Sequence, residues 1–563
     1  MAGGACTPDR LVAGASQAPN GEGAGRDMRG RVCSPRRTAS LRPRIGAAAD
    51  VRRDSTTGRR ASISDSGFAG SHDSVLASRA VFWHKEHMLK SCLCLCALGL
   101  AVVSAPAATN APTADTVKAT LARSTDYLTS IATQGGYLWR YSPDLQDRRG
   151  EVKATATQIW VQPPGTPSVG MAFLDAYAVT RDDRHLTAAH GAAMALARGQ
   201  LQSGGWAYLV EFDSEARRNW AYRTDAAKTN RRSTRASNVT TFDDDNTQSA
   251  LRFLLAYLDV ATNRPAQSLK PIRAALEYGL ARTLEAQYPN GAWPQRYNGA
   301  PHDPRKHPIQ PARIPANWPR TWPKTEYSGY YTLNDQTQRD CIRTMIQAWK
   351  RLGDRKYLDA ARKGGDFLML ARLPEPQAGW AQQYNFAMEP AWARAFEPPA
   401  VCGAESAGAM RTLMDLYLET GEAKFLKPIP GFVAWLKRSE VKPGQWARFY
   451  ELNTNKPIYG DRDGKVHYTL AEISGERRSG YSWQGAYGIP GVIQDYEALT
   501  ARGREAFRAG RQQNNRPAKS AENVITRILA QQDAQGRWLN QGWVDMRTFI
   551  RNMQALSGYL LTH

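Results

Sequence analysis

Apolar residues from about position 110 onward recur at intervals of three and four. Clear examples are the runs 170–179, 251–259 and 356–370. This spacing places the apolar side chains along one face of a helix, so it predicts amphipathic α-helices. Polar turns, such as those at 180–183 and 420–422, separate consecutive runs. The pattern therefore indicates helices that are joined in pairs.

A tryptophan beside a short turn recurs six times, and successive tryptophans lie 66 to 92 residues apart. One helical pair cannot bury its apolar face alone, so the repeat predicts stacked helical hairpins. An open solenoid and a closed toroid both satisfy it. Because an aromatic residue after a turn suits the end of an outer helix, we expect an all-α fold: an α/α toroid, an incomplete barrel of helical hairpins. Core packing is the alternative role for these residues, which are Trp139, Trp206, Trp293, Trp380, Trp446 and Trp538.

The N-terminal part of the chain has a different character. Residues 1–87 are rich in Ala, Arg, Ser and Gly and show no apolar periodicity. From Met88 a short basic segment, an apolar stretch at 91–104 and the sequence Ala105-Pro106-Ala107 follow one another. This order predicts a signal peptide at 88–107, too short to span a membrane permanently. We expect translation to start near Met88, with 1–87 a non-native leader; a disordered basic leader is the alternative.

The remaining segment, 108–563, is then expected to be a single repetitive domain that is secreted or periplasmic. The whole chain carries a formal net charge of +22, of which six charges lie in residues 1–87 and one is Lys90, which leaves +15. Such an excess suits a polyanion: nucleic acid, an acidic membrane surface or an acidic polysaccharide. No nucleic-acid-binding module is recognisable, and no other run of 18 apolar residues exists. An acidic polysaccharide is therefore the favoured partner, with no nucleic acid and no membrane span.

Cysteine usage adds little. Cys341 and Cys402 are the two cysteines of the segment 108–563, and no C-x-x-C zinc signature is present. One disulfide is possible in an oxidising compartment, but two isolated positions do not establish a pairing.

Carboxylates precede the first helix of successive hairpins. Equivalent helix starts in a toroid open to the same side, so these acids should converge at one mouth, whereas in a linear solenoid they would lie apart. A lone Asp at such a position is usually an N-cap. The run Asp243-Asp244-Asp245 exceeds what one cap needs, and it would be stabilised by a hard cation such as Ca²⁺. The corresponding positions are Asp244, Asp335 and Glu405 in three hairpins and Gly170 in the fourth.

Basic groups flank this predicted acidic mouth. The Pro-, Arg- and His-rich insert 298–326 predicts a long loop, which could form a basic lid or remain a solvated surface loop. Arg394 stands on extended chain shortly before a proline pair, and Arg478 belongs to a second basic group. An arginine is usually solvated or salt-bridged, but two such groups beside an acidic pocket suit a carboxylate-bearing substrate.

Several ordered motifs resemble the pectate lyases of polysaccharide lyase family 10. They are TFDDDNT (241–247), YPNGAWPQRY (288–297), YTLND (331–335), GWAQQY (379–384), RAFEPP (394–399) and ESAG (405–408). The resemblance implies an α/α toroid with long loops around a substrate cleft, and a Ca²⁺-dependent β-elimination of polygalacturonate. Departures are the extra acids Asp244 and Asp245, Ala292 in place of a glycine, and the longer insert.

The resemblance also implies roles for individual residues. Asp243 and Asp335 resemble Ca²⁺-linked aspartates, and Asp244 joins them as a third predicted metal ligand. Arg394 resembles the proposed arginine base, and Arg478 resembles an arginine that binds the substrate carboxylate. We further assign three residues of the matched motifs to substrate binding: Trp293, Arg296 and Asn334.

The implied chemistry fits these residue types. Elimination across C4–C5 of a uronic acid removes a weakly acidic proton next to the carboxylate, so Ca²⁺ and arginines bound to that carboxylate would stabilise the developing charge. Arg394 is an unusual base because a guanidinium normally stays protonated, and a carboxylate clamp is its alternative role. A terpenoid cyclase-like α/α barrel and a non-catalytic uronate-binding protein are the alternative functions. We expect the enzyme, a pectate lyase, to be a monomer.

Overall fold

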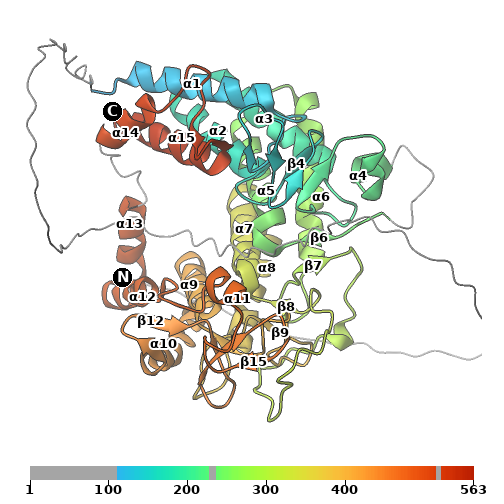
Figure 1. Cartoon of the computed structure of the whole chain (residues 1–563), viewed down its shortest axis with the longest axis vertical. Coiled ribbons are helices and arrows are strands. Elements are labelled where there is room, and N and C mark those ends of the chain that lie inside the picture. The colour runs from blue at the N-terminus through green and yellow to red at the C-terminus, as the bar shows by residue number, and fades with distance from the viewer. Residues whose placement is uncertain (1–110, 227–235, 515–521) are drawn as a thin grey trace, which may run out of the picture. The chain divides into compact units, whose positions relative to one another are not determined.

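The structure, a computed structural model, describes residues 111–226, 236–514 and 522–563 (Figure 1). The predicted leader and the predicted signal peptide lie outside the described residues. Within this part of the chain there are fifteen α-helices, while the strands are at most four residues long. The prediction of an all-α fold is therefore confirmed. No helix of the described residues has the length and apolar character needed to cross a membrane.

Six helices form an inner row in which each packs against the next. The row begins with α15, which packs on α2, and continues through α5, α7, α9 and α12. A second set of helices packs on this row in hairpins, including α3 on α2, α6 on α5, α8 on α7 and α13 on α12. This is the arrangement of an α/α toroid, as predicted. The inner helices are α2 (Thr166–Thr180), α5 (Asn246–Val260), α7 (Thr337–Leu352), α9 (Gly403–Thr420), α12 (Ile489–Arg502) and α15 (Met546–Leu560). The helices outside this inner row are α1 (Ala114–Ile131), α3 (Asp183–Gly199), α6 (Ala266–Glu285), α8 (Arg355–Ala371), α10 (Ile429–Arg438), α13 (Arg504–Asn514) and α14 (Glu522–Ala530).

Short antiparallel strands and single helical turns occupy the loops between the helices. The strands are β1 (Arg140–Tyr141), β2 (Arg148–Arg149), β3 (Lys153–Ala154), β4 (Gln158–Trp160), β5 (Leu209–Glu211), β6 (Thr240–Thr241), β7 (Arg296–Tyr297), β8 (Tyr331–Thr332), β9 (Gln383–Tyr384), β10 (Val401–Cys402), β11 (Glu440–Lys442), β12 (Gln445–Ala447), β13 (Phe449–Tyr450), β14 (Pro457–Gly460), β15 (Val466–His467), β16 (Gln484–Gly485), β17 (Leu539–Asn540) and β18 (Trp543–Asp545). They pair in the orders β17-β18-β1-β2-β3, β10-β13-β14-β15, β11-β12-β16, β4-β5, β6-β7 and β8-β9. The short helical turns are η1 (Ala216–Asn219), α4 (Arg223–Ala226), η2 (Asp243–Asp245), η3 (Pro304–Lys306), η4 (Asn334–Gln336), η5 (Ala423–Leu426) and α11 (Gly475–Gly480).

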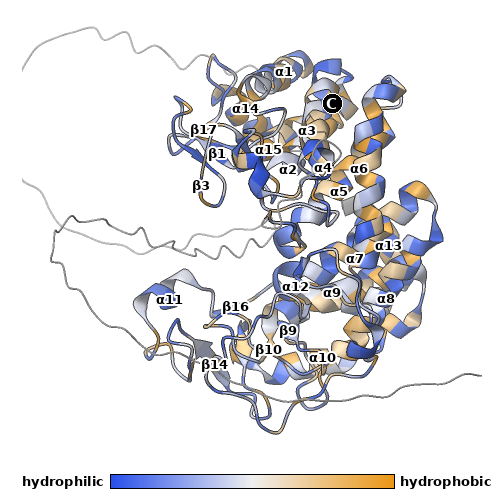
Figure 2. Ribbon diagram, turned by 90° about the vertical axis from the view of Figure 1, so that its right-hand side faces the viewer, coloured by the Kyte–Doolittle hydropathy of each residue, from blue (hydrophilic) through white to orange (hydrophobic). Residues whose placement is uncertain are grey.

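Helix α7 shows how the hydrophobic pattern produces this packing. On one face, Ile342 and Met345 are buried, while Arg343 on the other face is exposed. Hydrophobic and hydrophilic residues alternate in the same way along the other helices (Figure 2). The helix ends at Gly353, whose positive φ of 73° lets its amide donate to the Trp349 carbonyl. One face of the helix is thereby matched to the core and the other to polar surroundings.

Five of the six repeated tryptophans cap the ends of helices. In each, the indole Nε1 donates to a backbone carbonyl in the last turns of the preceding helix, at N···O distances of 2.7 to 2.9 Å. All five are also buried, so capping and core packing, which the sequence left as alternatives, both hold. Trp139 differs because it is half-buried and donates to the Gln162 carbonyl instead. The capped helices are α3, α6, α8, α10 and α14, and the capping residues are Trp206, Trp293, Trp380, Trp446 and Trp538.

Replacing Trp538 by Phe should lower the free energy of unfolding by about 1–3 kcal/mol, because the substitution leaves a carbonyl of α14 unbonded and a small cavity in the core. The Trp538 indole donates to the Ile528 carbonyl at 2.9 Å and the side chain is 2% exposed. Urea unfolding measures the change. An unfolding free energy equal to that of the wild type would show that the cap contributes no stability.

Two expectations from the sequence need correction or completion. Gly170 does not precede an inner helix: α2 begins at Thr166, and Gly170 lies inside the helix with the Phe253 ring packed against it. Cys341 and Cys402 are both buried free thiols, so they form no disulfide with each other.

The insert 298–326 is irregular apart from the single turn η3, as predicted. Most of its residues are exposed, as expected of a solvated surface loop, but it is not a free lid, because its backbone is bonded to the body of the fold. The Ala312 amide donates to the Leu370 carbonyl at 2.7 Å, and the Arg313 amide donates to the Met388 carbonyl at 3.0 Å. These contacts hold the insert against the end of α8 and the loop that follows β9.

Candidate active site

Two successive hairpins bring three aspartates together, as the spacing predicted. Asp243, Asp244 and Asp335 each place a carboxylate oxygen within 4.8 Å of the other two. Asp244 and Asp335 occupy equivalent positions in η2 and η4, with left-handed φ angles of 50° and 49°. Asp and Asn tolerate this conformation better than most residues. The same local backbone thus directs carboxylates from the starts of α5 and α7 toward one another.

Hydrogen bonds hold the three carboxylates in place but leave oxygens free to bind a ligand. Tyr208 donates its hydroxyl to Asp243 Oδ2 at 2.8 Å, and Gln162 donates to Asp244 Oδ2 at 2.9 Å. Asn334 donates to Asp335 Oδ2 at 2.5 Å. Among the described residues, the buried Asp243 Oδ1 has no hydrogen-bond partner.

Burial, together with repulsion among the three carboxylates, raises the pKa values of two of them. Burial and the neighbouring Asp243 carboxylate raise the pKa of Asp244 to about 8. The same two causes, with Asp244 added, raise the pKa of Asp335 well above its usual value. Mutual repulsion among buried carboxylates is relieved by a bound cation, and three carboxylates with an unpartnered oxygen fit a hard divalent ion. The residues therefore fit the predicted Ca²⁺.

Asp245 has a different role from its two neighbours. Its Oδ2 forms an ion pair with Arg252 on α5, and Arg252 also donates to Thr344 Oγ1 at 3.0 Å. Asp340 adds a second carboxylate whose charge acts on Arg252. The third aspartate of the run thus stabilises the contact between α5 and α7.

Asp245→Asn should therefore lower the free energy of unfolding by about 1–3 kcal/mol while leaving the Ca²⁺ affinity almost unchanged, because it weakens a partly buried ion pair. Chemical unfolding and calorimetric Ca²⁺ titration measure the two effects. A loss of Ca²⁺ affinity as large as that caused by Asp243→Asn would place Asp245 among the metal ligands.

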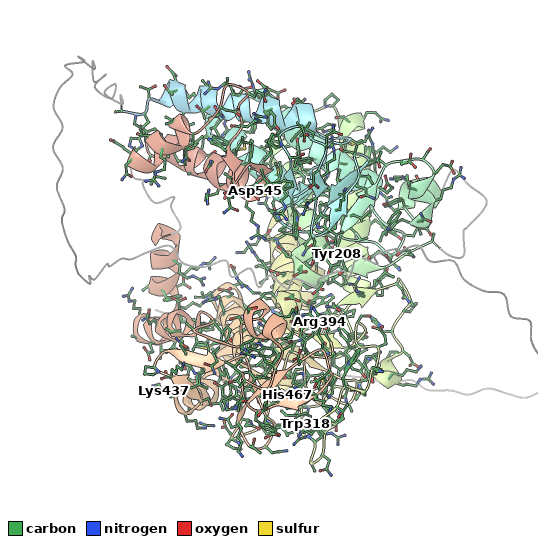
Figure 3. All side chains as sticks on the ribbon, viewed as in Figure 1. Tyr208, Trp318, Arg394, Lys437, His467 and Asp545 are labelled. Atoms are coloured by element: carbon green, nitrogen blue, oxygen red, sulfur yellow. The ribbon has the colours of Figure 1, made fainter. Side chains whose placement is uncertain are left out.

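Arg394, labelled in Figure 3, lies beside this cluster and its charge acts on Asp244 and Asp335. Its guanidinium is held by Glu397, with Nε donating to Oε2 at 2.8 Å and Nη2 donating to Oε1 at 2.5 Å. The Glu397 side chain is 1% exposed, whereas that of Arg394 is 32% exposed. Burial opposes the charge on Arg394, but the Glu397 carboxylate outweighs it and raises the pKa of Arg394 above its usual value. The arginine therefore carries a firmly held positive charge.

One basic residue of the site was missed by the sequence analysis. Arg448 is buried beside Glu405, at 3.6 Å between Nη2 and Oε1, and its guanidinium lies 4.3 Å from the centre of the Tyr481 ring. Glu405 lies in the first turn of α9, as expected, but it pairs with Arg448 and is not part of the three-aspartate cluster. The charges of Glu397 and Asp335 also act on Arg448.

A repeated position could have revealed Arg448. It stands two residues after Trp446, just as Tyr208 and Gln382 stand two residues after their tryptophans. The backbone carbonyl at this position accepts a bond from the chain at or just before the start of the inner helix of the same hairpin; the Gly403 amide, for example, donates to the Arg448 carbonyl at 3.0 Å. Gln382 is buried, and neither polar atom of its side chain has a partner among the described residues. Polar side chains at this position thus line the same region as the aspartates.

The remaining predicted residues have different environments. Trp293 has no exposed surface and its indole caps α6, so the expectation that it contacts substrate is corrected: its role is structural. Arg296 is exposed, with its guanidinium 5.6 Å from the centre of the Tyr208 ring, and its charge acts on Asp244. Asn334 orients Asp335, as described above. Arg478 is exposed on α11 and donates to the Ile473 carbonyl at 3.0 Å.

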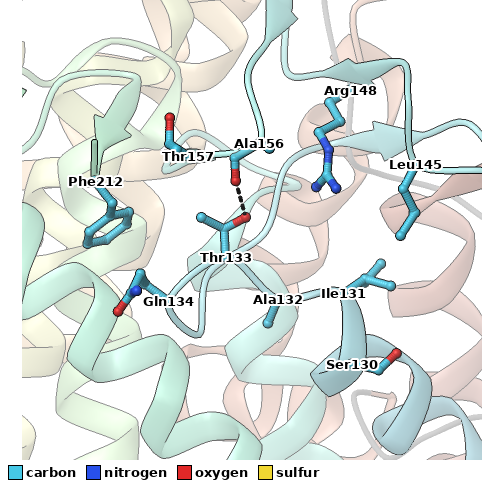
Figure 4. A pocket seen from close by; sticks show the side chains of 10 residues that line it. All are labelled: Ser130, Ile131, Ala132, Thr133, Gln134, Leu145, Arg148, Ala156, Thr157 and Phe212. Atoms are coloured by element: carbon cyan, nitrogen blue, oxygen red, sulfur yellow. Dashed lines mark hydrogen bonds between the residues drawn. The ribbon is translucent and has the colours of Figure 1, made fainter. Parts of the chain in front are cut away.

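A cavity of about 400 Å³ lies elsewhere, between the end of α1 and strands β2 to β5 (Figure 4). Arg148 is the single charged side chain in its lining, and Thr133 there donates to the Ala156 carbonyl at 2.9 Å. Without a carboxylate in its lining, this cavity cannot supply the predicted metal chemistry.

One family model matches part of the chain. The family model for pectic acid lyase matches residues 316–445 and 440–491, a region that contains Asp335, Arg394 and Arg448. This match confirms the resemblance predicted from the sequence and supports a polysaccharide lyase. No curated protein sequence matches the chain.

Solved structures of similar fold include carbohydrate-active enzymes. The family 10 polysaccharide lyase from Cellvibrio cellulosa is 21% identical, over 58% of this chain and 97% of that one, with a TM-score of 0.39. A mutant of that lyase in complex with trigalacturonic acid is 20% identical, over 58% and 98% of the two chains, with a TM-score of 0.39. The cellobiose 2-epimerase from Spirochaeta thermophila is 13% identical, over 81% and 99%, also with a TM-score of 0.39.

Proposed function

We propose that this protein is a pectate lyase that cleaves polygalacturonate by Ca²⁺-assisted β-elimination across C4–C5 and releases 4,5-unsaturated oligogalacturonides. The observation that supports it most is the combination of three converging aspartates with the charged Arg394 beside them. A cation on the aspartates and the guanidinium of Arg394 are both suited to a substrate carboxylate. The net charge of +15 in the segment 108–563 also favours a polyanionic substrate.

Asp243, Asp244 and Asp335 would hold the Ca²⁺. When bound, the ion would bind the uronate carboxylate and stabilise the negative charge that develops there. Tyr208 and Gln162 orient two of the three carboxylates through the hydrogen bonds given above, while Asn334 orients the third. These bonds keep the carboxylates in place before a substrate arrives, which reduces the reorganisation that binding requires.

Arg394 has two alternative roles, proton acceptor or carboxylate clamp, and the contact with Glu397 favours the second. A guanidinium that accepts a proton must first lose one, and the Glu397 carboxylate opposes that loss. A charged guanidinium in a fixed orientation can instead bind the uronate carboxylate, which is attached to the carbon that loses its proton. Arg448 and Arg296 add positive charge to the same region. We therefore assign Arg394 to stabilising the carboxylate of the reacting sugar, so that the C5 proton passes to solvent water or hydroxide and the departing O4 takes a proton from solvent.

Secretion or export to the periplasm completes the proposal. Polygalacturonate is an extracellular polymer, and the signal-like segment 88–107 would direct the chain to it. The mass of the chain purified from its native host tests this point: cleavage after Ala107 leaves a chain that begins at Ala108.

The reaction type is tested by product analysis in water enriched in oxygen-18. Elimination introduces no oxygen from the solvent, so the new chain ends should contain none and should be unsaturated. Saturated products that carry oxygen-18 would identify a hydrolase. Binding of polygalacturonate without any product would instead identify a non-catalytic uronate-binding protein.

A further inference from the structure

A segment of the insert is bonded to the chain on both of its sides. We name this segment, residues 318–322, the strap. On one side, the Trp322 indole Nε1 donates to the Ala393 carbonyl at 2.8 Å. The Trp392 indole donates in the opposite direction, to the Pro319 carbonyl, also at 2.8 Å. Two tryptophans thus form a reciprocal pair of hydrogen bonds between the strap and the chain just before Arg394.

The other side of the strap is fixed to the loop between β14 and β15. The Trp322 amide donates to the Gly464 carbonyl at 2.7 Å, and the Val466 amide donates to the Arg320 carbonyl at 3.3 Å. Arg320 also pairs with Glu451 at 3.1 Å. Gly464 has a φ of 74°, and a Cβ there would lie 3.1 Å from the Trp322 Cβ, so the close approach favours a glycine. Trp318 and His467, both labelled in Figure 3, mark the strap and strand β15.

The bond from Trp322 acts on the peptide unit that carries Arg394. The Ala393 carbonyl and the Arg394 amide belong to one planar peptide group. Trp322 binds the carbonyl end of this group, while the Arg394 amide donates to Glu397 Oε2 at 3.2 Å. Glu397 in turn holds the guanidinium of the same arginine. The strap and Glu397 therefore fix both ends of the peptide from which the Arg394 side chain projects.

We propose that the strap is a positioning device for Arg394, with Trp322 and Trp392 as the positioning residues. The insert then supports the reaction by holding a guanidinium in place and does not act as a lid. The kinetic part of this inference rests on the proposed function, because it takes Arg394 to act on the substrate. A misplacement of about 1 Å at such a group is enough to slow an enzyme about a hundredfold.

Three matched Trp→Phe variants test the proposal by kinetics. Trp322→Phe and Trp392→Phe keep an aromatic ring but remove the indole N–H, so each should lower kcat on polygalacturonate about tenfold with KM changed less than about twofold. Trp318→Phe is the control: it lies in the strap, is 7% exposed, and its Nε1 has no partner among the described residues. It should keep the wild-type kcat. Wild-type kcat in folded Trp322→Phe and Trp392→Phe would overturn the proposal.

A double variant tests whether the effect passes through Arg394. Trp322→Phe should cause little further loss when Arg394 is already Lys, because the group being positioned is gone. Losses that multiply would show that the strap acts independently of Arg394, which contradicts the proposal.

Hydrogen exchange gives a readout that does not depend on activity. In Trp322→Phe the amides of 393–397 should exchange at least about tenfold faster than in the wild type, since their bonds would no longer be held by the strap, whereas Trp318→Phe should not change them. Unchanged exchange in Trp322→Phe would overturn the positioning role even if the wild type cleaves polygalacturonate. Faster exchange in a protein that cleaves no uronate polymer would retain the strap and reject the proposed function.

Discussion

Replacing Asp335 by Asn is expected to lower kcat/KM on polygalacturonate about a thousandfold, which corresponds to about 4 kcal/mol of lost transition-state stabilisation. The amide removes one of the three negative charges that would hold Ca²⁺, so the affinity for the ion should fall too. Asn tolerates the left-handed backbone at this position, where φ is 49°. Initial rates and calorimetric Ca²⁺ titration measure both effects.

The control for this variant is Asp359→Asn on α8, where the side chain is 54% exposed. It removes the same charge from a surface position and should change neither the rate nor the Ca²⁺ affinity. An Asp335→Asn protein that binds Ca²⁺ like the wild type would contradict the assignment of the metal site.

Asp335→Asn should also stabilise the metal-free protein, because it relieves repulsion within the cluster.

The stability of the metal-free wild type should depend on pH. Burial and the charge of Asp243 raise the pKa of Asp244 to about 8, so the folded protein holds a proton that the unfolded chain releases at a pKa near 4. Metal-free stability should therefore fall as the pH rises from about 4 to about 8. Thermal unfolding in the presence of a chelator measures this. A melting temperature that rises across this range would contradict the electrostatic account.

Glu397→Gln is expected to lower kcat at neutral pH about a hundredfold, because the Arg394 fork loses the partner that orients it. This variant separates the two roles of Arg394. Loss of the carboxylate also makes the neutral guanidine easier to form, so an arginine that served as the base would become more effective. A higher rate in Glu397→Gln at neutral pH would therefore identify Arg394 as the base and reject the clamp.

Arg394→Lys should also lower kcat about a hundredfold, because an ammonium cannot reproduce the planar fork. Arg305→Lys in the insert, where the side chain is 89% exposed, is the matched control. Circular dichroism and thermal unfolding establish that each variant is folded before its rates are compared. Near-normal turnover by Arg394→Lys would remove the residue from the catalytic machinery.

The sequence predicted the parts of the site that follow from the repeat. The hairpins, the tryptophan turns and the convergence of Asp244 with Asp335 all depend on regular spacing, and the structure reproduces the spacing as equivalent backbone turns before α5 and α7. The role predicted for Trp293 was wrong. This residue belongs to a matched motif, but its indole caps α6, so its role is structural.

Other features depend on tertiary contacts that the pattern along the chain does not show. Gln162 bonds to Asp244 across 82 positions of sequence, and Arg448 acquires its role from Glu405 and Tyr481. Composition left a lid and a solvated loop as alternatives for the insert. It could not show the hydrogen bonds made by Trp322 and Trp392, because these join segments that are far apart in the sequence. In each of these cases, polar side chains meet across loops whose course has no periodic signal.

The central claim is that the aspartate cluster supports Ca²⁺-dependent elimination on polygalacturonate. The most direct measurement follows the ultraviolet absorbance of unsaturated uronate ends when the protein is mixed with polygalacturonate, first with a chelator and then with excess Ca²⁺. The account predicts no increase with the chelator and a steady increase once Ca²⁺ is added. Folded protein that produces no absorbance from polygalacturonate in the presence of Ca²⁺, or that produces it equally in the chelator, would contradict the account.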